Sequence, residues 1–125
     1  MVKQTHLYTN EKHIMFHGVG EMDVQGDNIS LSYIERDGIS KVRVNATFDT
    51  LCIERDAELK SRLPFKSKEK TMGTILSEFG EIDIEIYTHK YIFNKDTIAV
   101  EYDIVQGDEV IDGYRIIWNM KEEVK

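Results

Sequence analysis

The sequence predicts an all-β protein, a closed antiparallel up-and-down barrel of about eight to ten strands. The first observation is the alternation of polar and apolar residues through residues 81–104, because successive side chains of a strand point to opposite faces. The second is the turn chemistry between such segments, where Asp37-Gly38 is typical of a tight hairpin. The third is Gly18 and Gly20 inside a strand-like segment, where glycine lets a sheet bend or close on itself.

Strand-like segments follow one another along nearly the whole chain. We expect them at about 2–8, 13–24, 28–36, 40–47, 51–55, 58–65, 70–79, 81–89, 97–105 and 110–119. Residues 56–63 also fit two turns of helix, but a short helix without caps is marginal, so a strand is favoured. An open sheet would leave two exposed edges, which closure into a barrel or division into a sandwich relieves. The clean alternation and the early glycines favour the barrel.

Length and composition bound the class of protein. The 125 residues predict one domain, 1–125, with about 120–125 as a frayed tail. The net charge of −7 argues against a nucleic-acid partner, because phosphate backbones favour clustered Lys and Arg. No apolar run approaches the roughly 20 residues of a membrane helix, and no signal region is visible, so we expect a cytoplasmic protein without a membrane partner. Cys52 is the single cysteine, which excludes an internal disulfide, and no cofactor is expected.

The parity of the alternation points one base and one acid into the interior. Arg55 shares the face of Leu51 and Ile53, and Glu35 shares the face of Tyr33. Charges aimed at a largely apolar interior must pair with each other or meet a polar ligand. One interpretation is a structural ion pair that closes one end of the barrel. The other is a polar anchor for a small ligand in the barrel mouth.

Five residues form the candidate ligand-binding set. They are Arg55, Glu35, Tyr33, Tyr102 and Thr88, all expected on the inner face. In this hypothesis the Arg55 guanidinium holds a carboxylate or phosphate as a fork. The pattern therefore favours a non-catalytic barrel that binds a small molecule in its interior, an anionic one in the Arg55 hypothesis. No catalytic residue is assigned.

Two alternatives stay open. A barrel of about eight strands is filled by side chains in some proteins, so the chain is alternatively a protein–protein interaction module. Trp118 and Ile117 alternate to opposite faces of the last strand, and a homodimer would cover both faces. The more remote alternative is an enzyme that uses Glu35 in acid–base chemistry.

The outward-facing acids and the histidines do not predict a metal site. Asp83 is expected to face Glu101 or Asp103 across a strand pair, and a solvated stripe is favoured over a hard-cation site. His13 and His17 would lie about 13 Å apart on a strand, too far to share one ion. No metal is expected.

Several segments resemble the YwiB-like family, small bacterial proteins of unknown function. The segments that carry the resemblance are residues 32–35, 51–55, 63–65, 77–88 and 98–102. The chain departs from the pattern at Ala57, where a glycine is expected, and at Ser77, where a threonine is expected. The resemblance spans about residues 28–119 and implies a calycin-type, lipocalin-like barrel with no known activity.

Overall fold

The protein is built from β-strands. The computed structural model describes residues 1–16, 20–94 and 96–120, so the expected tail at 121–125 lies outside the described residues. These described residues form eleven strands: β1 (Val2–His6), β2 (Lys12–Phe16), β3 (Glu21–Gln25), β4 (Asn28–Ile34), β5 (Lys41–Ala46), β6 (Thr50–Asp56), β7 (Lys60–Lys66), β8 (Lys70–Ser77), β9 (Gly80–Phe93), β10 (Thr97–Gln106) and β11 (Glu109–Asn119). The described part of the chain contains no helix that could span a bilayer.

All eleven strands belong to one antiparallel sheet. Their order is β2-β1-β11-β10-β9-β8-β7-β6-β5-β4-β3. The hairpin predicted at Asp37-Gly38 joins β4 to β5, with Gly38 at φ 75°, a conformation that glycine adopts without strain. Residues 56–63 form the end of β6, a turn and the start of β7, as the strand interpretation predicted.

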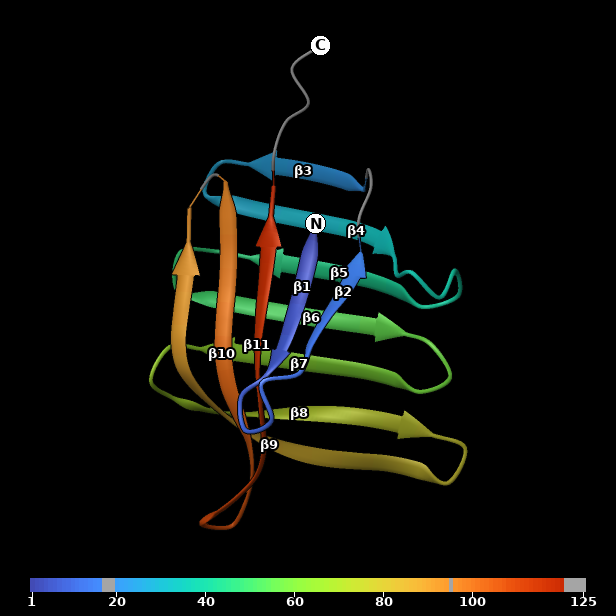
Figure 1. The fold of residues 1–125 in the computed structure, drawn as a ribbon, viewed down its shortest axis with the longest axis vertical. Coiled ribbons are helices and arrows are strands. Elements are labelled where there is room, and N and C mark those ends of the chain that lie inside the picture. Colours follow the sequence, from blue (N-terminus) through green and yellow to red (C-terminus); the bar gives the residue numbers. More distant parts are fainter. Residues whose placement is uncertain (17–19, 95, 121–125) are drawn as a thin grey trace.

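The sheet folds over on itself at β9. In Figure 1, β3 to β8 and the first part of β9 run across the view, while β10, β11, β1 and β2 cross them at a steep angle. The 14 residues of β9 are enough to take part in both layers. A β-bulge lies in β9, where Lys90 pairs with Glu101 and Thr88 with Tyr102. The backbone of His89 is therefore left without a partner residue on β10. Such bulges bend a strand and let it pass from one layer to another.

The sheet is an open half-barrel, so the predicted closure into a barrel of eight to ten strands is wrong. Segment 13–24 divides into β2 and β3, and these are the two ends of the sheet. The two layers cross steeply, so these ends run in different directions and make no ladder in the described residues. Instead, a backbone hydrogen bond of 3.0 Å from Arg36 N–H, in the turn between β4 and β5, to Met15 O of β2 links the two layers. The rings of Phe16 and Tyr33, 4.8 Å apart between centroids, pack beside this bond.

The inner face of β4 to β7 carries three rows of paired side chains. The deepest row is Ile29, Ala46, Leu51 and Phe65. The middle row is Leu31, Val44, Ile53 and Leu63. The outer row is Tyr33, Val42, Arg55 and Ser61. Tyr102 of β10 packs on Phe65 with ring centroids 4.8 Å apart, so the second layer covers the deepest row, whereas the outer row lies towards the open end.

We predict that Phe65→Ala lowers the free energy of unfolding by about 3–5 kcal/mol, because the lost aromatic ring leaves a cavity in the core. Phe65 is 2% exposed, whereas Phe48, in a turn, is 73% exposed. Phe48→Ala is therefore the matched control and should change the unfolding free energy by less than about 0.5 kcal/mol. Urea denaturation of the two variants measures the difference. Equal effects of the two substitutions would contradict the assignment of the core.

Candidate functional site

The predicted interior charges form an ion pair. Nε of Arg55 donates to Oε1 of Glu35 at 2.6 Å. Arg55 ends the inner-facing side of β6, and Glu35 follows β4, so the pair joins strands separated by β5. The Glu35 side chain is 7% exposed, but that of Arg55 is 44% exposed. One end of the guanidinium therefore satisfies a buried carboxylate, and the other end reaches solvent.

Arg55 and Tyr33 line an open hollow of about 670 Å³ on β4 to β7. Inner-facing residues such as Val42 and outward-facing residues such as Glu54 both contribute to its wall, so it is not an enclosed lumen. Its basic side chains are Lys41, Arg43, Arg55 and Lys60. Its carboxylates are Glu21, Glu54 and Asp56. The lining thus has four bases and three acids, and Glu35, which pairs with Arg55, brings the two signs into balance in a chain whose net charge is −7.

Tyr33 connects the two layers beside this hollow. Its hydroxyl accepts a hydrogen bond of 3.0 Å from Trp118 Nε1 of β11. Burial raises the pKa of Tyr33 to about 12, with the charge of Glu35 adding to the effect, so the phenol keeps its proton at neutral pH. The hydroxyl can therefore still donate one hydrogen bond. The part played by Trp118 was not predicted, because its position in the sequence, 85 residues away, gives no sign of the contact.

Tyr102 and Thr88 lie deeper and apart from Arg55. They pair directly across β10 and β9, and Tyr102 packs on Phe65 of the deepest row. Phe65 pairs with Leu51, four residues before Arg55, which corresponds to about 13 Å along a strand. Oγ1 of Thr88 is buried with no hydrogen-bond partner in the described residues. The structure thus brings together Arg55, Glu35 and Tyr33, and places the other two predicted residues in the core.

The turn beside the ion pair is held by Asp37. Its Oδ1 accepts hydrogen bonds of 2.8 Å from the backbone N–H groups of Ile39 and Ser40, and its Oδ2 accepts from the Ser40 hydroxyl. These bonds lower the pKa of Asp37 to about 2, because they favour the charged carboxylate, those of Ser40 most strongly. The backbone N–H of Glu35 also donates to Ser40 O at 2.8 Å. The position of Glu35 therefore depends on this turn.

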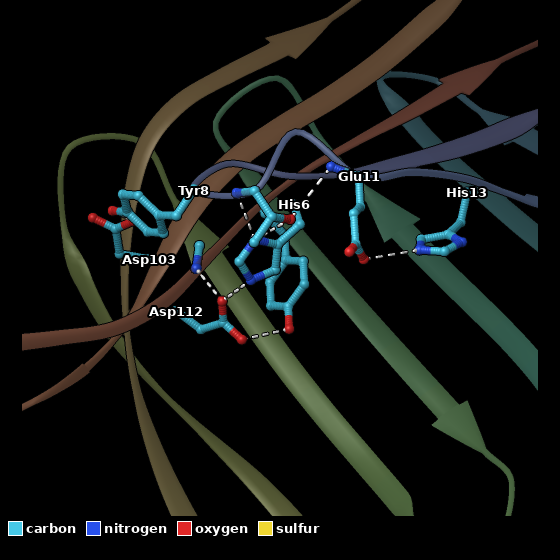
Figure 2. A network of polar contacts seen from close by, with 9 residues as sticks. His6, Tyr8, Glu11, His13, Asp103 and Asp112 are labelled. Carbon is cyan, nitrogen blue, oxygen red and sulfur yellow. Dashed lines mark hydrogen bonds and ion pairs between the residues drawn. The ribbon is translucent and has the colours of Figure 1, made fainter.

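A second polar cluster lies at the far end of β1 (Figure 2). Nε2 of His6 contacts Asp112, whose Oδ2 accepts a 2.6 Å hydrogen bond from the Tyr114 hydroxyl. The hydrogen bond from Tyr114 lowers the pKa of Asp112, and burial raises the pKa of Tyr114 to about 12. Nδ1 of His6 faces the backbone N–H of Thr9 at 3.2 Å. Both ring nitrogens of His6 are thus engaged within the protein, as in a structural histidine.

The same cluster contains a buried carboxylate, Asp103. The Tyr8 hydroxyl donates to its Oδ1 at 2.7 Å, and His89 Nε2 lies 2.5 Å from its Oδ2. A Cβ at Gly113 would lie 2.6 Å from that Oδ1 and 2.8 Å from the Tyr8 ring, so glycine is required there. The hydrogen bond to Asp103 raises the pKa of Tyr8. Sequence reasoning missed this group, because a loop that folds over an outward-facing residue leaves no periodic signal.

The expected stripe of facing acids does not form. Asp83 has no partner on β10, because the ladder between β9 and β10 ends at Glu85 and Val105; Asp103 lies opposite Tyr87, and Glu101 lies opposite Lys90. Glu101 instead accepts a 2.7 Å hydrogen bond from Arg115. In the described ranges, no group of three or more His, Cys, Asp or Glu gathers in a way that could hold a metal ion. His17 lies outside the described residues.

The fold and the site define a class of protein: an antiparallel half-barrel with an ion pair at its open end. The family model described as "Domain of unknown function (DUF1934)" matches residues 1–117, and the chain belongs to this family. A solved structure, "Crystal structure of ywiB protein from Bacillus subtilis", is similar at a TM-score of 0.70 and 19% identity, covering 97% of this chain and 89% of that chain. The predicted YwiB-like family is confirmed. No curated protein matches the chain.

We predict that Arg55→Ala lowers the free energy of unfolding by about 1–3 kcal/mol, because it leaves the buried Glu35 carboxylate without its partner. Arg115→Ala is the matched control, since Arg115 is similarly exposed and pairs with a more exposed acid, Glu101. Its loss should be below about 1 kcal/mol, as for other surface pairs. Chemical denaturation of both variants measures this. An Arg55→Ala variant as stable as wild type would show that Glu35 does not depend on the pair.

We predict that Asp37 stabilises the folded protein at neutral pH and that this stabilisation is lost in acid. A carboxyl whose pKa is lower in the folded state stabilises that state above the unfolded value. This stabilisation should therefore disappear as the pH falls from the usual Asp value of 3.8 towards about 2. Melting temperatures between these pH values measure it, and Asp37→Asn should flatten this part of the profile. The exposed Asp27→Asn variant is the control, and the same flattening in it would contradict the assignment.

Proposed function

We propose that this protein is a non-catalytic, cytoplasmic binding protein that takes a small anionic molecule at Arg55. The observation that carries the proposal is that the Arg55 guanidinium uses only its Nε–H within the described part of the protein. Its Nε–H is bonded to the buried Glu35 at 2.6 Å, and the described residues place no hydrogen bond on its other nitrogens. Those nitrogens are the ones that form a fork on a carboxylate or phosphate.

Pre-organisation supports this role for Arg55. The ion pair with Glu35 fixes the direction of a long side chain that would otherwise lose rotamer entropy on binding. Glu35 is itself held through the Asp37 turn, so this turn also helps to fix the position of the Arg55 side chain. A ligand would then meet a charged group already in place, in a hollow whose charges balance although the chain has a net charge of −7.

Tyr33 supplies a neutral donor beside the charged one. Tyr33 and Arg55 belong to the same outer row, two strands apart, which corresponds to about 10 Å between their backbones. The Tyr33 hydroxyl accepts from Trp118 and keeps its own proton, which is available to a ligand oxygen. Tyr102 and Thr88 are too deep to share this ligand, so the proposal rests on Arg55, Glu35 and Tyr33.

The other functions considered have less support. An enzyme that uses Glu35 would need a carboxylate free for proton transfer, whereas Oε1 of Glu35 already accepts from Arg55. A homodimer through the last strand is not favoured by a specific contact, since β11 lies between β1 and β10 and its Trp118 is buried within the chain. Anion binding at Arg55 is therefore the function that best accounts for the half-exposed guanidinium and the neighbouring Tyr33 hydroxyl.

We predict that inorganic phosphate or a small dicarboxylate causes NMR shift changes centred on Arg55, Tyr33 and Arg43 of the hollow. The affinity should fall at least about tenfold in Arg55→Ala, because the charged fork is lost. Arg115→Ala should bind like wild type. Native mass spectrometry of protein from its own host then tests for a retained anion. Shifts that persist unchanged in Arg55→Ala would overturn the proposed site.

A further inference from the structure

Three hairpins each present one large apolar side chain at the same end of the sheet. The turns β4–β5, β6–β7 and β8–β9 all project on one side of the molecule in Figure 1. Their tips carry Ile39, Leu59 and Phe79, which are 75%, 48% and 93% exposed. We call these three residues the hairpin rim. Turns normally carry small or polar residues, so an apolar side chain in each of three neighbouring turns requires an explanation.

The turns that carry the rim are ordered by local hydrogen bonds. Ile39 N–H donates to Asp37 Oδ1 at 2.8 Å, and Phe79 N–H donates to Ser77 Oγ at 3.2 Å. In the third turn, Ala57 N–H donates to the carbonyl of Leu59 at 3.2 Å. Apolar side chains on ordered turns lose little further freedom when a partner covers them, which favours binding.

The charges around the hairpin rim indicate the charge of the partner that it would bind. Five carboxylates lie in or next to the three turns: Asp37, Asp56, Glu58, Glu78 and Glu81. Apart from Arg55, which pairs with Glu35, the basic residues in or next to these turns are Arg36, Lys41 and Lys60. This excess of acid disfavours a second copy of a chain with net charge −7, and it disfavours anionic lipid or nucleic acid. A basic partner with apolar side chains is complementary to it.

The spacing of the rim selects the conformation of that partner. Alternate hairpins of a sheet are separated by two strand spacings, about 10 Å. Residues seven apart on an α-helix lie on one face at about 10.5 Å. On an extended strand, residues of one face lie about 6.6 or 13 Å apart, which does not match. A helix with apolar residues in a heptad repeat therefore fits the three tips.

We infer that the hairpin rim of Ile39, Leu59 and Phe79 is a docking surface for a basic, amphipathic helix of another protein. This surface is separate from the anion site proposed at Arg55, although the two adjoin at Asp56 and Lys60. The rim supplies apolar contacts, and the surrounding carboxylates supply charge complementarity. The partner helix lies across the three turns and not along the strands.

The test uses a labelled helical peptide of about three heptads, with leucine at one heptad position and lysine around it. Fluorescence anisotropy measures its binding to the full chain. The triple variant Ile39→Ser, Leu59→Ser, Phe79→Ser should bind at least about tenfold more weakly, because its apolar contacts are lost. Phe48→Ser removes a phenylalanine that is 73% exposed in a different turn, and this variant should bind like wild type. Circular dichroism checks that each variant folds. If the triple variant does not fold, the single variant Phe79→Ser takes its place.

Two control peptides and one control variant complete the design. A peptide with glutamate in place of lysine, and one with the leucines spread around the helix, should both bind weakly. Arg55→Ala should bind the basic peptide like wild type, which separates this inference from the anion site. Equal binding of all three peptides, or unchanged binding by the rim variant, would overturn the inference. A dimer in sedimentation equilibrium that the rim variant dissociates would also overturn it and assign the rim to a second copy.

Discussion

The structure depends on one constraint: an antiparallel sheet with an apolar face must cover that face, and this sheet covers itself. The bend and bulge of β9 near His89 turn the sheet so that β10, β11 and β1 lie over β4 to β7. This arrangement buries the two deeper rows of the inner face. In the deepest row, for example, Phe65 packs under Tyr102. The outer row that contains Arg55 and Tyr33 lies towards the open end. Trp118 of β11 still contacts Tyr33 in this row, whereas 44% of the Arg55 side chain is exposed, so the proposed site lies where the cover by the second layer ends.

The ion pair of Arg55 with Glu35 serves both stability and the proposed function. A carboxylate with 7% exposure needs a partner, and Nε of Arg55 supplies it. The rest of the guanidinium is directed by this bond and reaches solvent at the hollow. Charge is distributed unevenly around it, since the charges of the hollow balance while the nearby turns are acidic. A small anion and a basic helix would accordingly use adjacent but different surfaces.

The sequence was sufficient to predict what depends on local alternation. The all-β antiparallel class, the Asp37-Gly38 hairpin and the pairing of Arg55 with Glu35 all follow from side-chain parity and turn chemistry. Closure could not be predicted in this way, because it depends on how steeply two distant layers cross. The burial of Asp103 was missed as well, since the loop that carries Tyr8 covers an outward-facing position. Periodicity reports which face a residue takes, but not what lies over it.

The central claim is that the Arg55 guanidinium is divided between Glu35 and the open hollow. Nitrogen-detected NMR of arginine side chains tests this claim directly. The account predicts slow hydrogen exchange at Nε of Arg55, fast exchange at its two terminal nitrogens, and loss of the Nε protection in Glu35→Gln. Fast exchange at Nε in the wild type, or protection of the terminal nitrogens without an added anion, would contradict it.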